Sequence, residues 1–174
     1  MTVIALPIET ERLLVRPFAP DSDAGAMAEV YGDSEVMRFI PGGALADEEA
    51  VRALLERYMD AQARQGFSSW AVVERPTGRL IGDVGLGIFE PTGDIELGYT
   101  LARDYWGLGY ASEAAKACLA AALAHLDVPR IVAVVDLENE ASLRVSERIG
   151  MTRTKTIEAH GRPHALFVST PSSG

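Results

Sequence analysis

Apolar and polar residues alternate over several short stretches of the chain, a pattern typical of strands. Leu13, Val15 and Phe18 are the apolar members of the first stretch, which predicts a strand over residues 10–18. In the middle of the chain, turns rich in glycine and proline separate three further extended stretches. These predict three consecutive antiparallel strands, over residues 70–73, 80–89 and 95–101.

Helical spacing of apolar residues predicts the helices. Val51 and Leu55 recur at this spacing after Asp47, a residue that can cap a helix. Two short helices are expected before it, over residues 24–31 and 34–39. The remaining elements are an alanine-rich helix, a strand, a helix and two terminal strands, over residues 110–126, 131–135, 140–149, 152–157 and 165–169.

The order of these elements predicts a single α/β domain over residues 1–174, with its core at about 9–168 and a short flexible C-terminal tail. The alanine-rich helix separates the strand that ends at Leu101 from the strand over residues 131–135. These two strands can therefore be parallel neighbours joined by a helical crossover. The expected fold is a mixed, mainly antiparallel sheet of six or seven strands with helices on both faces.

Composition and charge narrow the possible functions. Of 174 residues, 48% are hydrophobic and 24% are charged, which is typical of a water-soluble globular protein. The 16 Lys and Arg residues against 25 Asp and Glu give a net charge of -9, which argues against nonspecific nucleic-acid binding. The single cysteine and three scattered histidines offer no disulfide framework and no zinc-ligand spacing, so no metal is expected. No apolar stretch approaches the roughly 20 residues that cross a bilayer, so we expect a cytoplasmic protein without a membrane span.

A glycine-rich turn opens the alanine-rich helix. Gly107 and Gly109 let the backbone approach a ligand without a Cβ in the way, and the first N–H groups of the helix favour a phosphate or pyrophosphate. A tight strand-to-helix turn that binds no ligand is the alternative. A Walker A loop is excluded, because neither Lys116 nor Lys155 follows a glycine.

Three motifs give the chain a resemblance to a known family. One segment resembles the cofactor loop of the GNAT acetyltransferases in the form usual in the branch of ribosomal-protein N-terminal acetyltransferases: Tyr105-Trp106-Gly107-Leu108-Gly109-Tyr110-Ala111-Ser112-Glu113-Ala114. Two further segments are similar to motifs of that branch: Glu9-Thr10-Glu11-Arg12-Leu13-Leu14-Val15-Arg16-Pro17, and Asn139-Glu140-Ala141-Ser142 followed by Glu147-Arg148-Ile149-Gly150-Met151. Trp106 departs from the wider family, in which Gln or Arg is common at this position.

The resemblance implies a transferase that uses acetyl-CoA as cosubstrate, bound between a splayed parallel pair formed by the fourth and fifth strands. Main-chain N–H groups of the loop would hold the pyrophosphate: Trp106, Gly107, Leu108, Gly109, Tyr110 and Ala111. The edge of the preceding strand would pair with the amides of the pantetheine arm: Tyr99, Thr100 and Leu101.

Two further sets of side chains are candidates for cofactor contacts. Asn139 and Ser142 would approach the pantetheine arm, although a helix cap is the alternative for both. Arg148 is a candidate for the phosphates, together with Arg103 and Arg144, because a polyanion that enters an acidic protein needs local positive charge. An ordinary solvated arginine is the alternative for each of the three.

The transfer requires a base and an acid. Glu96 is the expected base, because strand alternation puts it on the same face as Gly98, and the family often has a glutamate there. A solvent-facing strand residue is the alternative. Ser142 is the candidate proton donor to the departing thiolate, since the tyrosine that many relatives use four residues later is Ser146 here.

The expected activity is acetyl transfer from acetyl-CoA to a primary amine by direct attack in a ternary complex. The acceptor is a protein N-terminus or a small-molecule amine, and the acidic balance of the chain favours a cationic one. An acyl-CoA-binding sensor or interaction module without turnover is the alternative. A monomer and a homodimer are both open.

Overall fold

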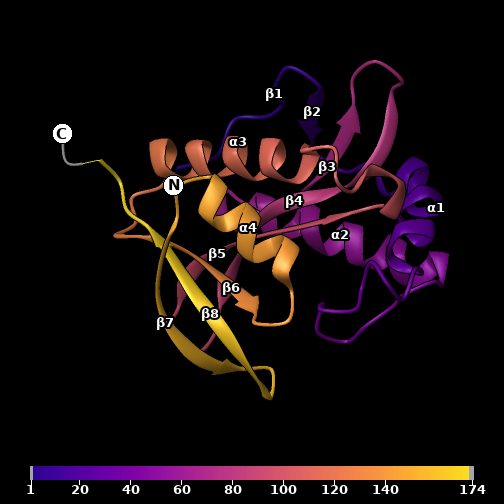
Figure 1. The fold of residues 1–174 in the computed structure, drawn as a ribbon. Helices are drawn as coiled ribbons and strands as arrows, with labels where there is room; N and C mark the ends of the chain where they lie inside the picture. The colour runs from indigo at the N-terminus through magenta and orange to yellow at the C-terminus, as the bar shows by residue number, and fades with distance from the viewer. Residues whose placement is uncertain (1, 173–174) are drawn as a thin grey trace.

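One mixed sheet of eight strands forms the centre of the computed structural model, which describes residues 2–172 (Figure 1). The strands lie in the order β1-β2-β3-β4-β5-β6-β8-β7. They are β1 (Ile8–Glu9), β2 (Leu13–Arg16), β3 (Ser69–Glu74), β4 (Arg79–Phe89), β5 (Asp94–Leu101), β6 (Ile131–Asp136), β7 (Thr152–Ala159) and β8 (Arg162–Ser169). The helices are α1 (Pro20–Tyr31), α2 (Glu48–Gln65), the short 3-10 helix η1 (Arg103–Tyr105), α3 (Tyr110–His125) and α4 (Glu140–Arg148). Of the expected flexible tail, residues 173 and 174 lie outside the described residues.

The strand predicted over residues 10–18 is observed as the shorter β2, and a turn at its predicted start separates β2 from an additional short strand, β1. The Thr10 N–H donates to the Leu13 carbonyl at 2.9 Å, and the Leu13 N–H donates to Thr10 Oγ1 at 3.0 Å. The two short strands pair with each other antiparallel. The expected count of six or seven strands is therefore corrected to eight, and the parallel pair is β5 and β6 instead of the fourth and fifth strands.

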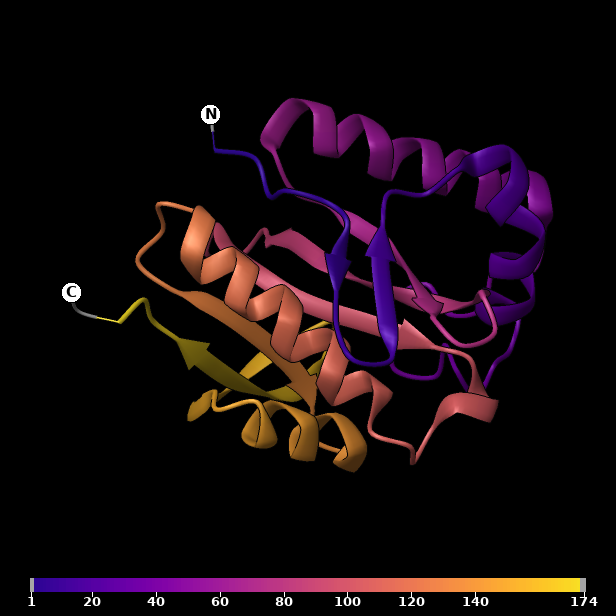
Figure 2. The same ribbon diagram turned by 90° about the horizontal axis from the view of Figure 1, so that it is seen from above.

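Helices cover both faces of the sheet, as predicted. Figure 2 shows α2 on one side of the sheet and α3 and α4 on the other. On the α3 side, Leu97 of β5 and Ala115 of α3 belong to one buried cluster, and the small side chains of α3 let it lie close to the strands. On the other side, Ala71 of β3 packs in a second cluster with Val51 and Leu55 of α2.

The segment between α1 and α2 is a series of turns, so the helix predicted over residues 34–39 is wrong. Its backbone bonds are isolated: the Met37 N–H donates to the Asp33 carbonyl, and the Ile40 N–H to the Met37 carbonyl, both at 3.0 Å. Gly43, with a φ of 69°, then takes a left-handed conformation that a helix cannot contain. The later helix does begin at Asp47, whose side chain accepts from the Glu49 N–H as a cap.

The parallel strands β5 and β6 diverge soon after they meet. Their register partners are Ile95 with Ile131 and Glu96 with Val132. Beyond Glu96, β5 continues beside β4 as far as Leu101, whereas β6 continues beside β8. Among residues 2–172, no strand therefore pairs with the last five residues of β5 on the side that faces β6.

Glycines form the surface of β4 and β5 beside Glu96. Gly87 is the register partner of Glu96, and Gly85 is the partner of Gly98. A Cβ on Gly85 would lie 2.3 Å from the Ser68 carbonyl oxygen, whereas a Cβ on Gly87 or on Gly98 would meet nothing within 4 Å. Gly85 is therefore required by packing, and the other two glycines leave open space next to the carboxyl group.

This difference predicts opposite outcomes for two alanine substitutions in one strand. Gly85→Ala forces Cβ into main-chain atoms that cannot turn away, so we expect a loss of about 2 to 3 kcal/mol in the free energy of unfolding. Gly87→Ala should change it by less than about 0.5 kcal/mol. Urea denaturation followed by circular dichroism measures both, and equal losses would contradict the packing role of Gly85.

Candidate active site

A groove of about 500 Å³ opens where β5 leaves β6. Four segments line it: the turns that follow α1, the free end of β5, the loop that leads into α3, and the start of α4. The residues predicted to contact the cofactor lie in this lining, with the exceptions of Leu108 and Arg103. The side chain of Leu108 is largely exposed, and its carbonyl oxygen accepts from Arg12 Nη1 at 2.8 Å.

The loop before α3 has the backbone conformation that its glycines predict. Gly107 and Gly109 have φ angles of 73° and 83°, in the left-handed region that favours glycine. Gly109 is the N-cap of α3, and no side chain in the described range 2–172 caps the helix. The first N–H groups of α3 are therefore left without a side-chain acceptor at the wall of the groove, as an anion site requires.

Arg12 holds this loop, and sequence reasoning missed its role. Its Nε donates to Glu113 Oε1 at 2.9 Å, and its guanidinium lies 4.3 Å from the centre of the Tyr110 ring. Glu113 Oε2 also accepts from the Thr10 hydroxyl at 2.7 Å. The sequence signal existed, because both ends of this contact lie in motifs of the family, but the pattern did not indicate that the two motifs touch.

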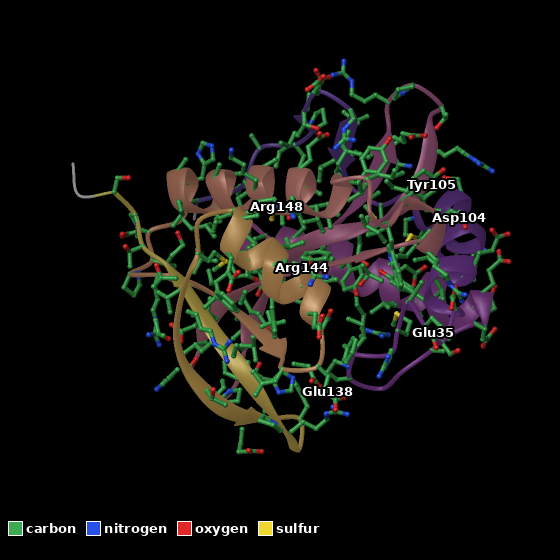
Figure 3. All side chains as sticks on the ribbon, in the orientation of Figure 1. Glu35, Asp104, Tyr105, Glu138, Arg144 and Arg148 are labelled. Atoms are coloured by element: carbon green, nitrogen blue, oxygen red, sulfur yellow. The ribbon has the colours of Figure 1, made fainter. Side chains whose placement is uncertain are left out.

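Two of the arginines that line the groove lie on α4. Figure 3 shows Arg144 and Arg148 along this helix, with Glu35 and Tyr105 across the groove from them. Arg148 Nη1 donates to Ser112 Oγ at 3.1 Å, close to the start of α3. The third candidate, Arg103, lies outside this groove and pairs with the carboxylate of Asp33.

The free edge of β5 ends at a tryptophan. Trp106 Nε1 donates to the Leu101 carbonyl oxygen at 2.9 Å, while about half of the Trp106 side chain remains exposed. This contact is made by the residue that stands where Gln or Arg is common in relatives. Thr100, one residue earlier, turns its side chain away from the edge and hydrogen bonds to the buried Asp83.

Glu96 lies on the opposite face of β5 from Tyr99, at the point where the strands part. It is partly buried, which contradicts a purely solvent-facing role. Burial raises the pKa of Glu96 to about 7, and a hydrogen bond from the Val134 N–H opposes that rise. The carboxyl group is thus poised to exchange a proton near neutral pH.

The start of α4 brings three of the predicted residues together. Asn139 is the N-cap, and its Oδ1 accepts from the Ser142 N–H at 3.2 Å. Ser142 Oγ in turn accepts from the Tyr99 hydroxyl at 2.9 Å. Ser146, which occupies the position of the tyrosine of many relatives, is buried.

The sequence did not predict which residues form the outer wall of the groove, the part of the lining contributed by the turns after α1. Val36, Phe39 and Ile40 supply apolar side chains there, and Glu35 and Arg38 supply charges of opposite sign. The turns that carry these residues follow no periodic pattern, so no sequence signal marked them individually.

Two further structural properties bear on the class of protein. Among residues 2–172, no helix has the length and apolar character needed to cross a bilayer. Within the same range, no three His, Cys, Asp or Glu side chains are grouped so that they could hold a metal ion.

Comparisons with known proteins agree with this geometry. The family model described as acetyltransferase (GNAT) domain matches residues 12–152. YkkB of Bacillus subtilis (strain 168) is 32% identical over 160 residues, which are 91% of this chain and 92% of YkkB. The uncharacterized N-acetyltransferase YnaD of the same organism is 33% identical over 146 residues, 84% of this chain and 82% of YnaD.

Solved structures show the same fold. The crystal structure of a GNAT-family acetyltransferase from Bacillus anthracis has a TM-score of 0.82 at 29% identity, covering 97% of this chain and 100% of that one. RimL, a ribosomal L7/L12 alpha-N-protein acetyltransferase solved in complex with coenzyme A, has a TM-score of 0.81 at 16% identity, covering 95% and 98%. The expected family and enzyme class are thereby confirmed: the chain belongs to the GNAT acetyltransferases, the acyltransferases that use acetyl-CoA as acetyl donor.

Proposed function

We propose that the protein transfers the acetyl group of acetyl-CoA to a primary amine by direct attack in a ternary complex. The observation that carries this proposal is Glu96, a partly buried carboxyl group with a pKa near 7 at the point where β5 and β6 diverge. An amine is mostly protonated at neutral pH and must lose a proton to become a nucleophile, which makes such a carboxylate useful. The open space beside Gly87 and Gly98 gives the amine a path to it.

The groove suits the CoA part of the donor. The uncapped start of α3 leaves N–H groups that can bind the pyrophosphate. Gly107 leaves room for this group, because the space that a Cβ would occupy there is open. Arg144 and Arg148 supply positive charge for the phosphates. The free edge of β5, which Trp106 closes at Leu101, favours the amides of the pantetheine arm. The thioester supplies the activated acetyl group.

The transfer also requires a proton donor to the departing sulfur of CoA. Ser142 lines the groove from α4, where the Asn139 cap fixes the position of its backbone. The hydroxyl of Ser142 is on the groove side of β5, and Glu96 is on the opposite face. This separation supports Glu96 as the base and Ser142 as the proton donor.

A peptide N-terminus is the acceptor that we propose. RimL is a ribosomal L7/L12 alpha-N-protein acetyltransferase, and a Vibrio fischeri structure of the same fold is a ribosomal-protein-S5-alanine acetyltransferase with a TM-score of 0.81 at 19% identity. The outer wall contains the apolar Phe39, which can contact the first side chain of a peptide. It also contains the charged Glu35 and Arg38, which can hydrogen bond to the peptide main chain. The net charge of -9 favours the approach of a cationic amine.

The loop assignment predicts the effect of a side chain at Gly109. Gly109→Val should raise the dissociation constant of acetyl-CoA at least about tenfold, because the left-handed loop and its N–H groups would be displaced, a loss of about 1.4 kcal/mol. Isothermal titration calorimetry measures this. Gly93→Val is the matched control, since Gly93 also has a positive φ, of 74°, in a turn outside the groove. Equal acetyl-CoA affinities in the two folded variants would contradict the assignment of this loop to pyrophosphate binding.

The assignment of the base predicts a pH dependence. Glu96 must be ionised to accept a proton, so with a pKa of about 7 the wild-type kcat should fall as the pH drops below 7. Glu96→Gln should remove this acidic limb and lower kcat at pH 7.5 about a hundredfold, with unchanged acetyl-CoA affinity. Free-thiol release in the presence of peptide and small-molecule amines measures the rate. Normal turnover by Glu96→Gln would place the base elsewhere.

The same assay separates the proposal from its alternative. A sensor or interaction module would bind acetyl-CoA in the calorimeter but release no thiol with any amine. Transfer to peptide N-termini and not to polyamines supports the proposed acceptor, and the reverse pattern supports a small-molecule amine.

Glu96 also predicts a change in stability that needs no substrate. The pKa of the folded state is raised from 4.5 to about 7, so the folded protein holds a proton that the unfolded chain releases, and stability falls as the pH rises from about 4.5 to 7. Glu96→Gln should remove this loss and gain on the order of 3 kcal/mol relative to wild type at pH 8, with little gain at pH 4. Urea denaturation at the two pH values measures it, with the exposed Glu56→Gln on α2 as control. A gain that is equal at both pH values would refute the perturbed carboxyl.

A further inference from the structure

A contact between two hydroxyl groups crosses the groove on the α4 side of β5. The Tyr99 hydroxyl donates to Ser142 Oγ at 2.9 Å, and both residues line the groove. Tyr99 lies three residues beyond Glu96, in the part of β5 that has no strand partner toward β6. The contact therefore spans the gap between the free end of β5 and the start of α4.

Ser142 has hydrogen-bonding capacity left after this contact. Its N–H donates to Asn139 Oδ1, and its Oγ accepts from Tyr99. Within residues 2–172, no protein group accepts the hydroxyl proton of Ser142. The two hydroxyls therefore form an ordered pair in which Tyr99 donates to Ser142, and Ser142 can donate to a group in the groove.

We infer that Tyr99 is a second proton donor of the acetyl transfer and delivers its proton to the departing sulfur through Ser142. This inference rests on the proposed function and deepens it. No residue of α4 supplies a phenol here, because Ser146 stands at that position and is buried. Tyr99 supplies the phenol from the strand instead.

The acidities of a phenol and an alkyl hydroxyl favour proton donation by Tyr99 through Ser142 over donation by Ser142 alone. A phenol loses its proton near pH 10 and a thiol near pH 8.5, so the phenol is the weaker acid of the two, but it is much closer to the thiol than an alkyl hydroxyl is. Burial raises the pKa of Tyr99, and the hydrogen bond to Ser142 opposes the rise, so the phenol keeps its proton at neutral pH. Ser142 passes that proton on and needs no stable alkoxide of its own.

The proposed step is balanced. Glu96 first passes the ammonium proton to solvent. The neutral amine nitrogen then forms a bond to the acetyl carbon, the bond from that carbon to sulfur breaks, and the further proton that nitrogen loses goes to Glu96. Sulfur takes the Ser142 hydroxyl proton while Ser142 takes the Tyr99 proton. Glu96 has gained one proton and Tyr99 has lost one, and exchange with solvent after product release restores both.

Strand alternation places the two proton-transfer groups on opposite sides of β5. Glu96 shares a face with Val132, and Tyr99 packs on the face that α3 and α4 cover. A purely structural role for Tyr99, attaching α4 to the sheet, would explain the contact but would affect all ligands of the groove equally. This difference is the basis of the test.

The test compares the binding of CoA with that of desulfo-CoA, in which hydrogen replaces the thiol. In wild type, CoA should bind increasingly better than desulfo-CoA as the pH rises, because the hydroxyl pair stabilises the bound thiolate. Tyr99→Phe should reduce this preference about tenfold and leave desulfo-CoA affinity unchanged. Calorimetric titration across pH 6 to 9 measures both ligands and requires no acceptor.

Two further variants complete the experiment. Ser142→Ala should have the same effect as Tyr99→Phe, and the double variant should lose no more than the larger single loss, because the groups act in series. Tyr58→Phe is the control, since this partly buried phenol hydrogen bonds to Tyr31 and Ser69 on the other side of the sheet.

The outcomes are distinct. An equal effect of Tyr99→Phe on both ligands, no effect on either, or additive losses in the double variant would overturn the relay. In that case CoA binding and thiol release by wild type still support the proposed function. Absence of CoA binding by wild type would overturn the proposed function itself.

Discussion

The site depends on the divergence of β5 from β6. The two strands pair at Ile95 and Glu96 and then separate, while β4 and β8 hold each of them from the outer side. Side chains span the gap on both faces: Glu96 accepts from the Val134 N–H on one, and Tyr99 donates to Ser142 on the other. The backbone thus opens between two strands that are each held by a partner on the outer side.

Charge in the molecule is arranged around this opening. A chain of net charge -9 repels a polyanion at long range, so the groove must supply attraction locally. Arg12 is already neutralised by Glu113 and acts on the loop through geometry. Arg162 is engaged with Asp136 and Glu138 on the side of β8. Arg148 hydrogen bonds to the neutral Ser112, and no carboxylate among residues 2–172 forms a salt bridge with it, so its charge remains available to the groove.

The sequence predicts those parts of the fold that local patterns determine. The extended runs of β3 to β5 and the alanine-rich α3 are periodic, and the glycines at 107 and 109 carry their own conformational signal, so all were predicted close to their observed bounds. The turn at Thr10 and the turns after Asp33 depend on a few local hydrogen bonds, which periodicity does not report. The contacts of Arg12 with Glu113 and of Tyr99 with Ser142 join residues 101 and 43 positions apart, and only the folded chain brings them together.

The free edge of β5 has a consequence for the ligand-free protein. An unpaired strand edge is a template on which another extended chain can pair, which is a route to aggregation. Here the exposed length is short, because it begins after Glu96 and the indole of Trp106 occupies the carbonyl at Leu101. The start of α4 lies over it through the contact of Ser142 with Tyr99. A foreign strand therefore finds only a few residues to pair with, too few to form a stable ladder, and this edge is protected by the same groups that shape the groove.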